Sequence, residues 1–347
     1  MRTLTITYPH QIMERRKHVS LQWIEWNALW TMIRAELADH GEEKESGDGK
    51  MRFFLSMKNM VRKYPTRFDA TCLEQRQAQP TVAWISPLRV EYNAAVRAMG
   101  ETCETEDNGY LITRAIVNRH HVVVVHRKVR GIGATSAAAY GSYLQSTFPD
   151  LQLLLLVGTG GGIAESDVQL GDVVVWCPGS RLHSEPRDQD WAHRAKPVGE
   201  NVTTALTELR SSPPTLKVDS TKDCLYQWDY DHNGERRDCS KCDPAKLVRR
   251  DPRDPAGPVI RYGGVAPVSQ VVRDTRERRK YLGYFCLEME SPGLLETTPT
   301  VVCRGISDYA DSHKNDLWQG FASSQAATVA ICFLRHLEPF RHVQKSI

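Results

Sequence analysis

The chain has 347 residues, of which 45 are lysine or arginine and 42 are aspartate or glutamate, so its formal net charge is +3. A charge this close to zero gives no electrostatic reason to expect nucleic acid or an anionic membrane as a partner. Hydrophobic residues make up 41% and charged residues 25% of the chain, which excludes wholesale disorder. No apolar run approaches the roughly 20 residues that span a bilayer, and the first ten residues lack the apolar core of a signal peptide. We therefore expect a soluble chain with a large core.

Nine cysteines are scattered along the sequence, an odd number that no complete set of internal disulfides can use. Most of them lie in apolar surroundings, such as Cys303 after two valines and Cys332 between isoleucine and phenylalanine. This usage is typical of buried free thiols in a reducing compartment. It predicts a cytoplasmic location.

Residues 1–78 differ in pattern from the rest, and we expect them to form a helical extension followed by a linker. A helix is predicted over residues 20–39, where apolar side chains recur at three- and four-residue spacing. These side chains are Trp23, Trp26, Trp30, Ile33 and Leu37. The polar stretch 41–49 is typical of a solvated loop. A stripe of this kind is usually packed on its own domain, and a partner-binding helix is the alternative.

From residue 81 onward, short apolar runs alternate with helical segments. The predicted strands are residues 81–85, 110–117, 121–126, 152–157, 172–177, 259–267, 285–288 and 300–305, and the predicted helices are 91–99, 134–147 and 318–337. Such alternation, with near-continuous apolar strands, predicts a three-layer α/β/α sandwich around a central mixed, mostly parallel sheet. We expect this domain to occupy residues 79–340.

An insertion, residues 219–258, interrupts this pattern and is rich in Asp, Arg and Pro. Such a segment inside a compact domain usually forms a lid, a small subdomain or a ligand-stabilised loop. Cys239 and Cys242, with Cys224 and His232 nearby, have a spacing that a structural zinc site can use. A single closely spaced pair of cysteines is more often a pair of free thiols. We therefore predict no metal, with zinc at these cysteines as the alternative.

Two glycine-rich segments adjoin the predicted strands and helices. Val157-Gly-Thr-Gly-Gly-Gly162 follows a buried strand, and Arg130-Gly-Ile-Gly133 precedes the helix at 134–147. Glycine lets backbone amides approach a ligand closely, and a helix N-terminus favours an anionic or hydroxyl-bearing one. Lys128 and Arg130 would add positive charge beside the second segment. The first segment matches no nucleotide fingerprint, so a tight turn without a ligand is the alternative.

Two pairs of polar residues, each with at least one acid, stand at the predicted carboxyl ends of apolar strands. They are Glu288 with Glu290, and Ser307 with Asp308. Ligands of open α/β sheets bind at this edge of the sheet. Acids here are often only caps or ion-pair partners, but two clusters on successive strands favour a functional site.

These acids also carry a family resemblance. Glu288-Met-Glu290 followed by Arg304-Gly-Ile-Ser-Asp308-Tyr-Ala-Asp resembles the nucleoside phosphorylase/nucleosidase superfamily of purine and uridine phosphorylase-like domains, which cleave N-ribosyl bonds. Asp308-Tyr-Ala-Asp-Ser-His-Lys-Asn-Asp-Leu-Trp-Gln-Gly320 is similar to a fungal branch whose domains are often fused to NACHT, ankyrin or tetratricopeptide modules. The resemblance covers residues 81–337. It implies cleavage of a purine nucleoside by a homo-oligomer that needs no resident cofactor.

The resemblance also implies roles for individual residues. Glu290 would hold the ribose hydroxyls, Asp308 would protonate the purine imidazole nitrogen as the base leaves, and Glu91 would activate water. The implied substrate-binding residues are Thr159, Gly160, Gly161, Val271, Val272, Glu288, Met289 and Ser307. The chemistry is consistent, because a carboxylate stabilises the cationic sugar of the transition state and a positioned acid contributes roughly 10²–10⁴-fold.

The acceptor of the ribosyl group is the remaining choice. Glu91 favours water, since a carboxylate can take its proton, whereas Arg89 with Lys128 or Arg130 could neutralise a bound phosphate. Arg89 and Glu91 are two helical steps apart, about 200° around the axis, so we do not expect both to face the site. We favour hydrolysis. Phosphorolysis with inorganic phosphate as co-substrate and a non-catalytic nucleoside-sensing domain are the alternatives.

Overall fold

The computed structural model describes residues 2–5, 18–21, 78–129, 131–178, 196, 198–216, 223–234, 239–250, 258–296 and 298–340. The chain divides into two compact units, Met1–Phe68 and Asp69–Ile347. In the first unit, β1 (Arg2–Thr5) pairs antiparallel with β2 (His18–Leu21). Residues 20 and 21, the first two of the helix expected over 20–39, belong to strand β2 instead. The rest of that helix, with its tryptophans, and the linker at 41–49 lie outside the described residues.

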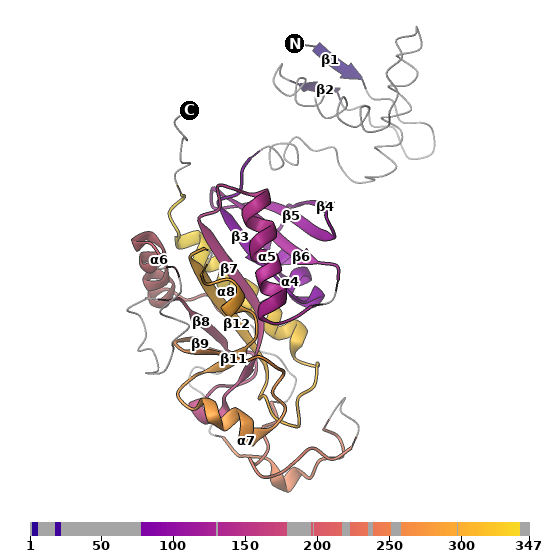
Figure 1. The fold of residues 1–347 in the computed structure, drawn as a ribbon, viewed down its shortest axis with the longest axis vertical. Helices are drawn as coiled ribbons and strands as arrows, with labels where there is room; N and C mark the ends of the chain where they lie inside the picture. Colours follow the sequence, from indigo (N-terminus) through magenta and orange to yellow (C-terminus); the bar gives the residue numbers. More distant parts are fainter. Residues whose placement is uncertain are drawn as a thin grey trace. The chain divides into compact units, whose positions relative to one another are not determined.

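The second unit is built on one sheet (Figure 1). Its strands are β3 (Val82–Ile85), β4 (Cys103–Asp107), β5 (Tyr110–Val117), β6 (His120–Arg127), β7 (Leu153–Gly162), β8 (Val173–Trp176), β9 (Ile260–Tyr262), β10 (Val265–Pro267), β11 (Cys286–Glu288) and β12 (Thr300–Asp308). Their order is β4-β5-β6-β3-β7-β12-β8-β9, and β11 joins the sheet through β7 and pairs with β10. The four central strands, β6-β3-β7-β12, are parallel. β4 and β5 pair antiparallel with their neighbours, whereas β8 is antiparallel to β12 and parallel to β9.

Helices cover both faces of this sheet. They are α4 (Arg89–Met99), α5 (Ala134–Thr147), α6 (Glu200–Ser211) and α8 (Gln319–His336). The unit also contains the short helix α7 (Thr275–Arg278) and the 3-10 turns η1 (Ala164–Ser166), η3 (Pro244–Lys246), η4 (Arg279–Tyr281) and η5 (Ser291–Gly293). One core cluster joins α4, α6 and α8 to one face, and a second joins α5 to the other. The predicted three-layer arrangement around a mixed sheet is confirmed.

Alternation along the strands explains why both faces are covered. All four residues of β3 are buried, and successive side chains of a strand point to opposite faces. Val82 and Trp84 join the cluster of α4, α6 and α8, whereas Ala83 and Ile85 join that of α5. A strand that is apolar at every position requires this environment.

The described part of the chain differs from the sequence predictions at several elements. β7 runs through Gly162, so residues 158–162 extend a strand where we expected a turn, and they pair with β12 on one side and β11 on the other. The strand predicted at 259–267 is two strands, β9 and β10. The sequence analysis missed β4 and α6 altogether.

The cysteines follow the prediction with one exception. Seven described cysteines are free thiols, four of them buried. Cys103 is disulfide-bonded, which corrects the expectation that the cysteines carry no disulfide.

The insertion at 219–258 is folded wherever the structure describes it. Tyr226 and Leu247 form an antiparallel bridge, and η3 follows Asp243, whose carboxylate caps it. Tyr226 and Cys242 are buried. Among the described residues, no helix combines the length and apolar character needed to cross a bilayer.

Candidate active site

The glycine-rich end of β7 allows charged groups from two other elements to meet beside it. A Cβ on Gly158 would lie 2.3 Å from Oε1 of Glu91 and 2.7 Å from Nη1 of Arg304. A Cβ on Gly161 would lie 3.1 Å from Oδ1 of Asp308. Real Cβ atoms do not make contacts as short as those at Gly158. The glycines therefore admit neighbouring side chains to the strand rather than forming a turn around an anion.

Arg304, on β12, is the central cation of this region. It is 1% exposed, and its Nη2 donates to Oε2 of Glu288 at 2.7 Å and to Oε2 of Glu290 at 2.8 Å. Burial by itself lowers the pKa of Arg304, but the carboxylates of Glu288, Glu290 and Glu91 outweigh it and raise that pKa. The guanidinium stays charged and compensates three buried acids.

Glu91 lies in the first turn of α4 and is buried. Its Oε1 accepts from the backbone N of Thr159 at 2.7 Å and from Thr159 Oγ1 at 3.1 Å, and its Oε2 accepts from Leu88 N at 2.9 Å. Burial raises the pKa of Glu91, and the charge of Arg304 offsets only part of that rise. A carboxylate with a raised pKa is a better proton acceptor than an ordinary glutamate.

Glu290 is held from two sides. Besides Arg304, its carboxylate accepts at Oε1 from the backbone N of Gly133 at 3.0 Å. Gly133 is the N-cap of α5 and has a φ of 86°, which favours glycine. The helix N-terminus expected to bind an anionic or hydroxyl-bearing ligand is therefore used by a carboxylate of the chain itself. Each carboxylate oxygen of Glu290 has further acceptor capacity for a hydroxyl-bearing ligand.

Glu288 is occupied by its own neighbourhood. Its carboxylate accepts from Glu290 N at 3.0 Å and from Ser291 N at 3.0 and 3.1 Å, and it contacts the Ser291 hydroxyl. With Arg304 as a fourth partner, this acid holds the turn after β11 in place. The arrangement gives Glu288 a positioning role for Glu290.

Asp308 ends β12 at an irregular point of the sheet. The β12–β7 register shifts between Ile306 and Asp308, the signature of a bulge, which often re-aims a side chain near a site. The carboxylate of Asp308 is buried and accepts from Ser307 Oγ at 2.9 Å and from Ala310 N at 2.9 Å. It also makes an ion pair with Lys314.

Of the other predicted binding residues, some lie next to the acids or to Gly133, and the two valines lie in or beside a small apolar cluster. Thr159 and Gly160 lie on β7, with Thr159 bonded to Glu91, and Met289 approaches Gly133, where a Cβ would lie 3.6 Å from Met289 Cε. Val272 is buried in a small apolar cluster that also contacts Met289, whereas Val271 is 42% exposed.

The residues proposed for phosphate do not converge in the described structure. Arg89 is exposed, with its guanidinium 5.1 Å from the centre of the Tyr92 ring, while Glu91 is buried. Lys128 forms an exposed ion pair with Glu106. Arg130 lies outside the described residues.

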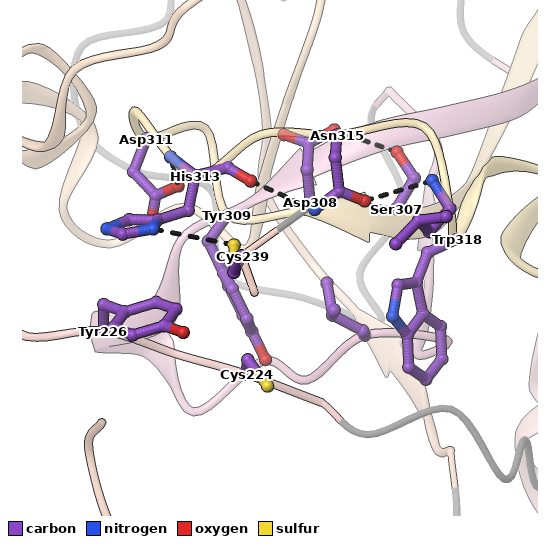
Figure 2. A pocket seen from close by; sticks show the side chains of 12 residues that line it. Cys224, Tyr226, Cys239, Ser307, Asp308, Tyr309, Asp311, His313, Asn315 and Trp318 are labelled. Atoms are coloured by element: carbon purple, nitrogen blue, oxygen red, sulfur yellow. Dashed lines mark hydrogen bonds between the residues drawn. The ribbon is translucent and has the colours of Figure 1, made fainter. Parts of the chain in front are cut away.

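A cavity of about 230 Å³ opens beside Asp308. Figure 2 shows Ser307, Asp308 and Trp318 along one part of its wall and Tyr226, Cys239 and His313 along another. Glu91 and Glu290, which are both described in the structure, are not among the residues that line this cavity. The cavity therefore adjoins Asp308 from the side of the insertion.

Sequence reasoning missed Arg304, Lys314 and His313 as residues of this region. Arg304 left a signal, because an arginine inside an apolar strand needs buried acids as partners. Lys314 and His313 left none, since their partners are fixed only by the path of the loop after β12.

Comparisons with solved structures give a consistent set of neighbours. The 5'-methylthioadenosine/S-adenosylhomocysteine nucleosidase of Neisseria meningitidis has a TM-score of 0.49 at 15% identity, over 73% of this chain and 98% of that chain. The nucleosidase of S. pneumoniae has a TM-score of 0.49 at 18% identity, over 74% and 99%. Futalosine hydrolase of Helicobacter pylori has a TM-score of 0.48 at 15% identity, over 73% and 97%.

One curated relative is similar in sequence. A nucleotide-binding leucine-rich repeat (NLR)-like protein of Hyaloscypha variabilis is 28% identical over 312 residues, which cover 77% of this chain and 31% of that protein. The chain thus spans less than a third of the length of this relative. No family model matches the sequence.

Proposed function

We propose that the second unit hydrolyses the N-glycosidic bond of a purine nucleoside. The observation that carries the proposal is the meeting of three acids around the glycine end of β7. Glu91 accepts a hydrogen bond from the backbone N of Thr159. Glu290 accepts one from Arg304, whose charge also acts on Glu91. Asp308 on β12 is paired with Gly161 on β7. The motif resemblance to nucleosidases assigns a role to each of these acids.

The proposed roles follow from charge development during bond cleavage. The sugar gains positive charge, which Glu290 stabilises while it binds the ribose hydroxyls. The base gains negative charge, which Asp308 neutralises by donating a proton. Glu91 takes a proton from the attacking water, and its raised pKa suits it to this task. In this scheme Lys314 releases Asp308 when the base binds, Asp308 takes up a proton from solvent, and it then passes that proton to the base.

Water is favoured over phosphate as the acceptor. A dianion near Glu91 and Glu290 would need cations, and the one buried guanidinium of the described site, Arg304, is already shared by acids. Arg89 lies over Tyr92, and Lys128 is paired with Glu106.

The test is release of purine from adenosine, guanosine and inosine with and without phosphate, with ribose and ribose 1-phosphate measured as products. We expect free ribose at the same rate in both buffers. Glu91→Gln and Asp308→Ala should each lower the rate by about 10²-fold or more, whereas Glu101→Gln, an exposed glutamate just beyond α4, should leave it unchanged. Strict phosphate dependence, or loss of activity in Arg89→Ala, would refute hydrolysis.

A second candidate is a nucleoside-binding domain without turnover. One observation favours it: the three acids of the site are all engaged by the chain itself, with Thr159, Arg304 and Lys314 as partners. The similarity to an NLR-like protein is compatible with a sensing role for this domain. Nucleoside binding by calorimetry without release of base would support this candidate against the first.

A further inference from the structure

Four metal-ligating side chains converge where the insertion meets the loop after β12. His232, Cys239 and Cys242 come from the insertion, and His313 comes from the loop after β12. One ligand atom of each lies within 4.8 Å of all the others. Nδ1 of His313 is 3.8 Å from Sγ of Cys239, as Figure 2 shows, and 3.7 Å from Sγ of Cys242. Tetrahedral zinc with Zn–S of about 2.3 Å and Zn–N of about 2.0–2.1 Å places sulfur and nitrogen about 3.6 Å apart.

His313 is oriented to present one nitrogen to this cluster. Its Nε2 lies 3.0 Å from the carbonyl oxygen of Tyr230, and a carbonyl can only accept, so Nε2 carries the proton. Nδ1 then has its lone pair directed at the two sulfurs. A ligand histidine almost always has such a partner on its other nitrogen. The ring also stacks on Tyr226 at 4.1 Å and 13°.

Hydrogen bonding lets only one of the two sulfurs use the nitrogen of His313. Nδ1 has a single lone pair in the ring plane, so it can accept from one thiol, yet two sulfurs approach it at nearly equal distances. A cation at the centre satisfies the nitrogen and both sulfurs at once. Two thiolates and two imidazoles are the ligand set that zinc prefers in closed structural sites.

We propose that His232, Cys239, Cys242 and His313 form a structural Cys2His2 zinc site. Cys242 and His313 are buried and the other two half-buried, so four protein ligands close the site. On binding, the two thiols lose their protons to solvent. The sequence analysis had considered zinc with Cys224, but the fourth ligand is His313, and Cys224 lies outside the cluster along the wall of the cavity.

The site ties the insertion to the loop that follows Asp308. His313 follows Asp308 by five residues, and the backbone N of His232 donates to Ser312 Oγ at 2.9 Å in the same loop. Zinc would therefore fix the loop from which Lys314 contacts Asp308. This positioning role rests on the proposed function, whereas the metal site does not.

The test is the zinc content of the full chain, measured by mass spectrometry after expression with added zinc and gel filtration. We expect about one zinc per chain for the wild type, for Cys224→Ser and for Cys332→Ser. Cys242→Ser and His313→Ala should lose it. Cobalt in place of zinc should give the intense visible bands of a tetrahedral thiolate site.

A measurement on the wild type guards against variants that do not fold. A strong chelator should lower the Tm of the wild-type chain, and added zinc should restore it. A wild type that binds no zinc, or a Cys224→Ser variant that loses as much zinc as Cys242→Ser, would overturn the proposal. Full zinc content in a chain that releases no purine would leave the metal site standing and refute the proposed reaction alone.

Discussion

Replacing Arg304 by methionine removes the one cation shared by the acids at the centre of the candidate site. Methionine keeps much of the length and apolar stem of the side chain, so the cavity that it leaves is small. The acids remain: Glu288 and Glu290 each lose a hydrogen bond from Nη2, at 2.7 and 2.8 Å, and Glu91 loses a compensating charge. We therefore expect the free energy of unfolding to fall.

The size of the loss follows from the burial of the pair. Arg304 is 1% exposed, so solvent does not screen its interactions. Removing one partner of a buried ion pair costs about 3–5 kcal/mol. In a domain of this size each kcal/mol shifts Tm by about 2–4 °C, so Tm should fall by about 6–20 °C. Arg273→Met, an exposed arginine on the loop before α7, is the matched control and should be nearly neutral.

The loss should also depend on pH. Burial raises the pKa of Glu91 and Arg304 lowers it, so the variant moves that pKa further above its value in the unfolded chain. An acid whose pKa rises on folding destabilises the fold above its unfolded pKa, and the cost grows as pH increases toward the folded pKa. The difference between wild type and Arg304→Met should therefore be larger at pH 8 than at pH 5.

Urea melts at the two pH values, with fluorescence or circular dichroism as the probe, measure this difference. The double variant Arg304→Met/Glu290→Gln should regain part of the stability, because it also removes a buried negative charge while its amide oxygen can still accept from Gly133. A loss below about 1 kcal/mol, far short of the expected range, would refute the reasoning. So would an equal loss at both pH values.

Three further predictions concern the rest of the second unit. Gly305→Ala should destabilise by about 1–3 kcal/mol, since its Cβ would lie 2.0 Å from a backbone carbonyl oxygen of α8. Gly320→Ala should be neutral or stabilising in thermal melts, because its Cβ would lie 3.9 Å from Cγ2 of Val90, an ordinary van der Waals contact. Equal effects of the two substitutions would contradict this. Burial lowers the pKa of His126, so the free energy of unfolding should fall as pH drops below the pKa of an unfolded histidine. In urea melts, His126→Gln should make the free energy of unfolding less dependent on pH in this range. An unchanged pH dependence would contradict this prediction. Tyr309→Phe removes the hydroxyl that donates to Asp223 of the insertion at 2.8 and 2.9 Å. Because this contact holds the insertion to the end of β12, proteolysis within the insertion should become faster. An unaltered rate of cleavage would show that this hydrogen bond does not anchor the insertion.

Much of the fold was predictable, because its strands are apolar and its helices periodic. The strand at Tyr110–Val117 and the helix at Ala134–Thr147 were predicted at their observed bounds. β4 was missed because its alternating acidic residues and threonine lie at an edge of the sheet, where polarity hides a strand. α6 was missed although its buried residues, among them Val202 and Leu206, follow helical spacing.

The site was predictable as a set of acids but not as a network. Glu91, Glu290 and Asp308 stood out by motif, and Glu290 and Asp308 also by their position at strand ends. Their cations did not, because Arg304 and Lys314 act through contacts that form only when distant strands meet. The continuation of β7 through its glycines was missed for a related reason, since pairing with β11 and β12, and not local preference, keeps this segment extended.

Strand β7 pairs with three others, β3, β12 and β11, and all the acids of the candidate site gather near its carboxyl end. The groups that meet there come from positions as far apart as Glu91 and Asp308, so chain segments of high sequence separation must close before any of them is in place. Loop closure of this kind is slow, and we therefore expect the site to form late in folding. A partly folded chain would carry the helices and the outer hairpin without a competent site, and hydrogen exchange at β7 should report the same opening free energy as global unfolding.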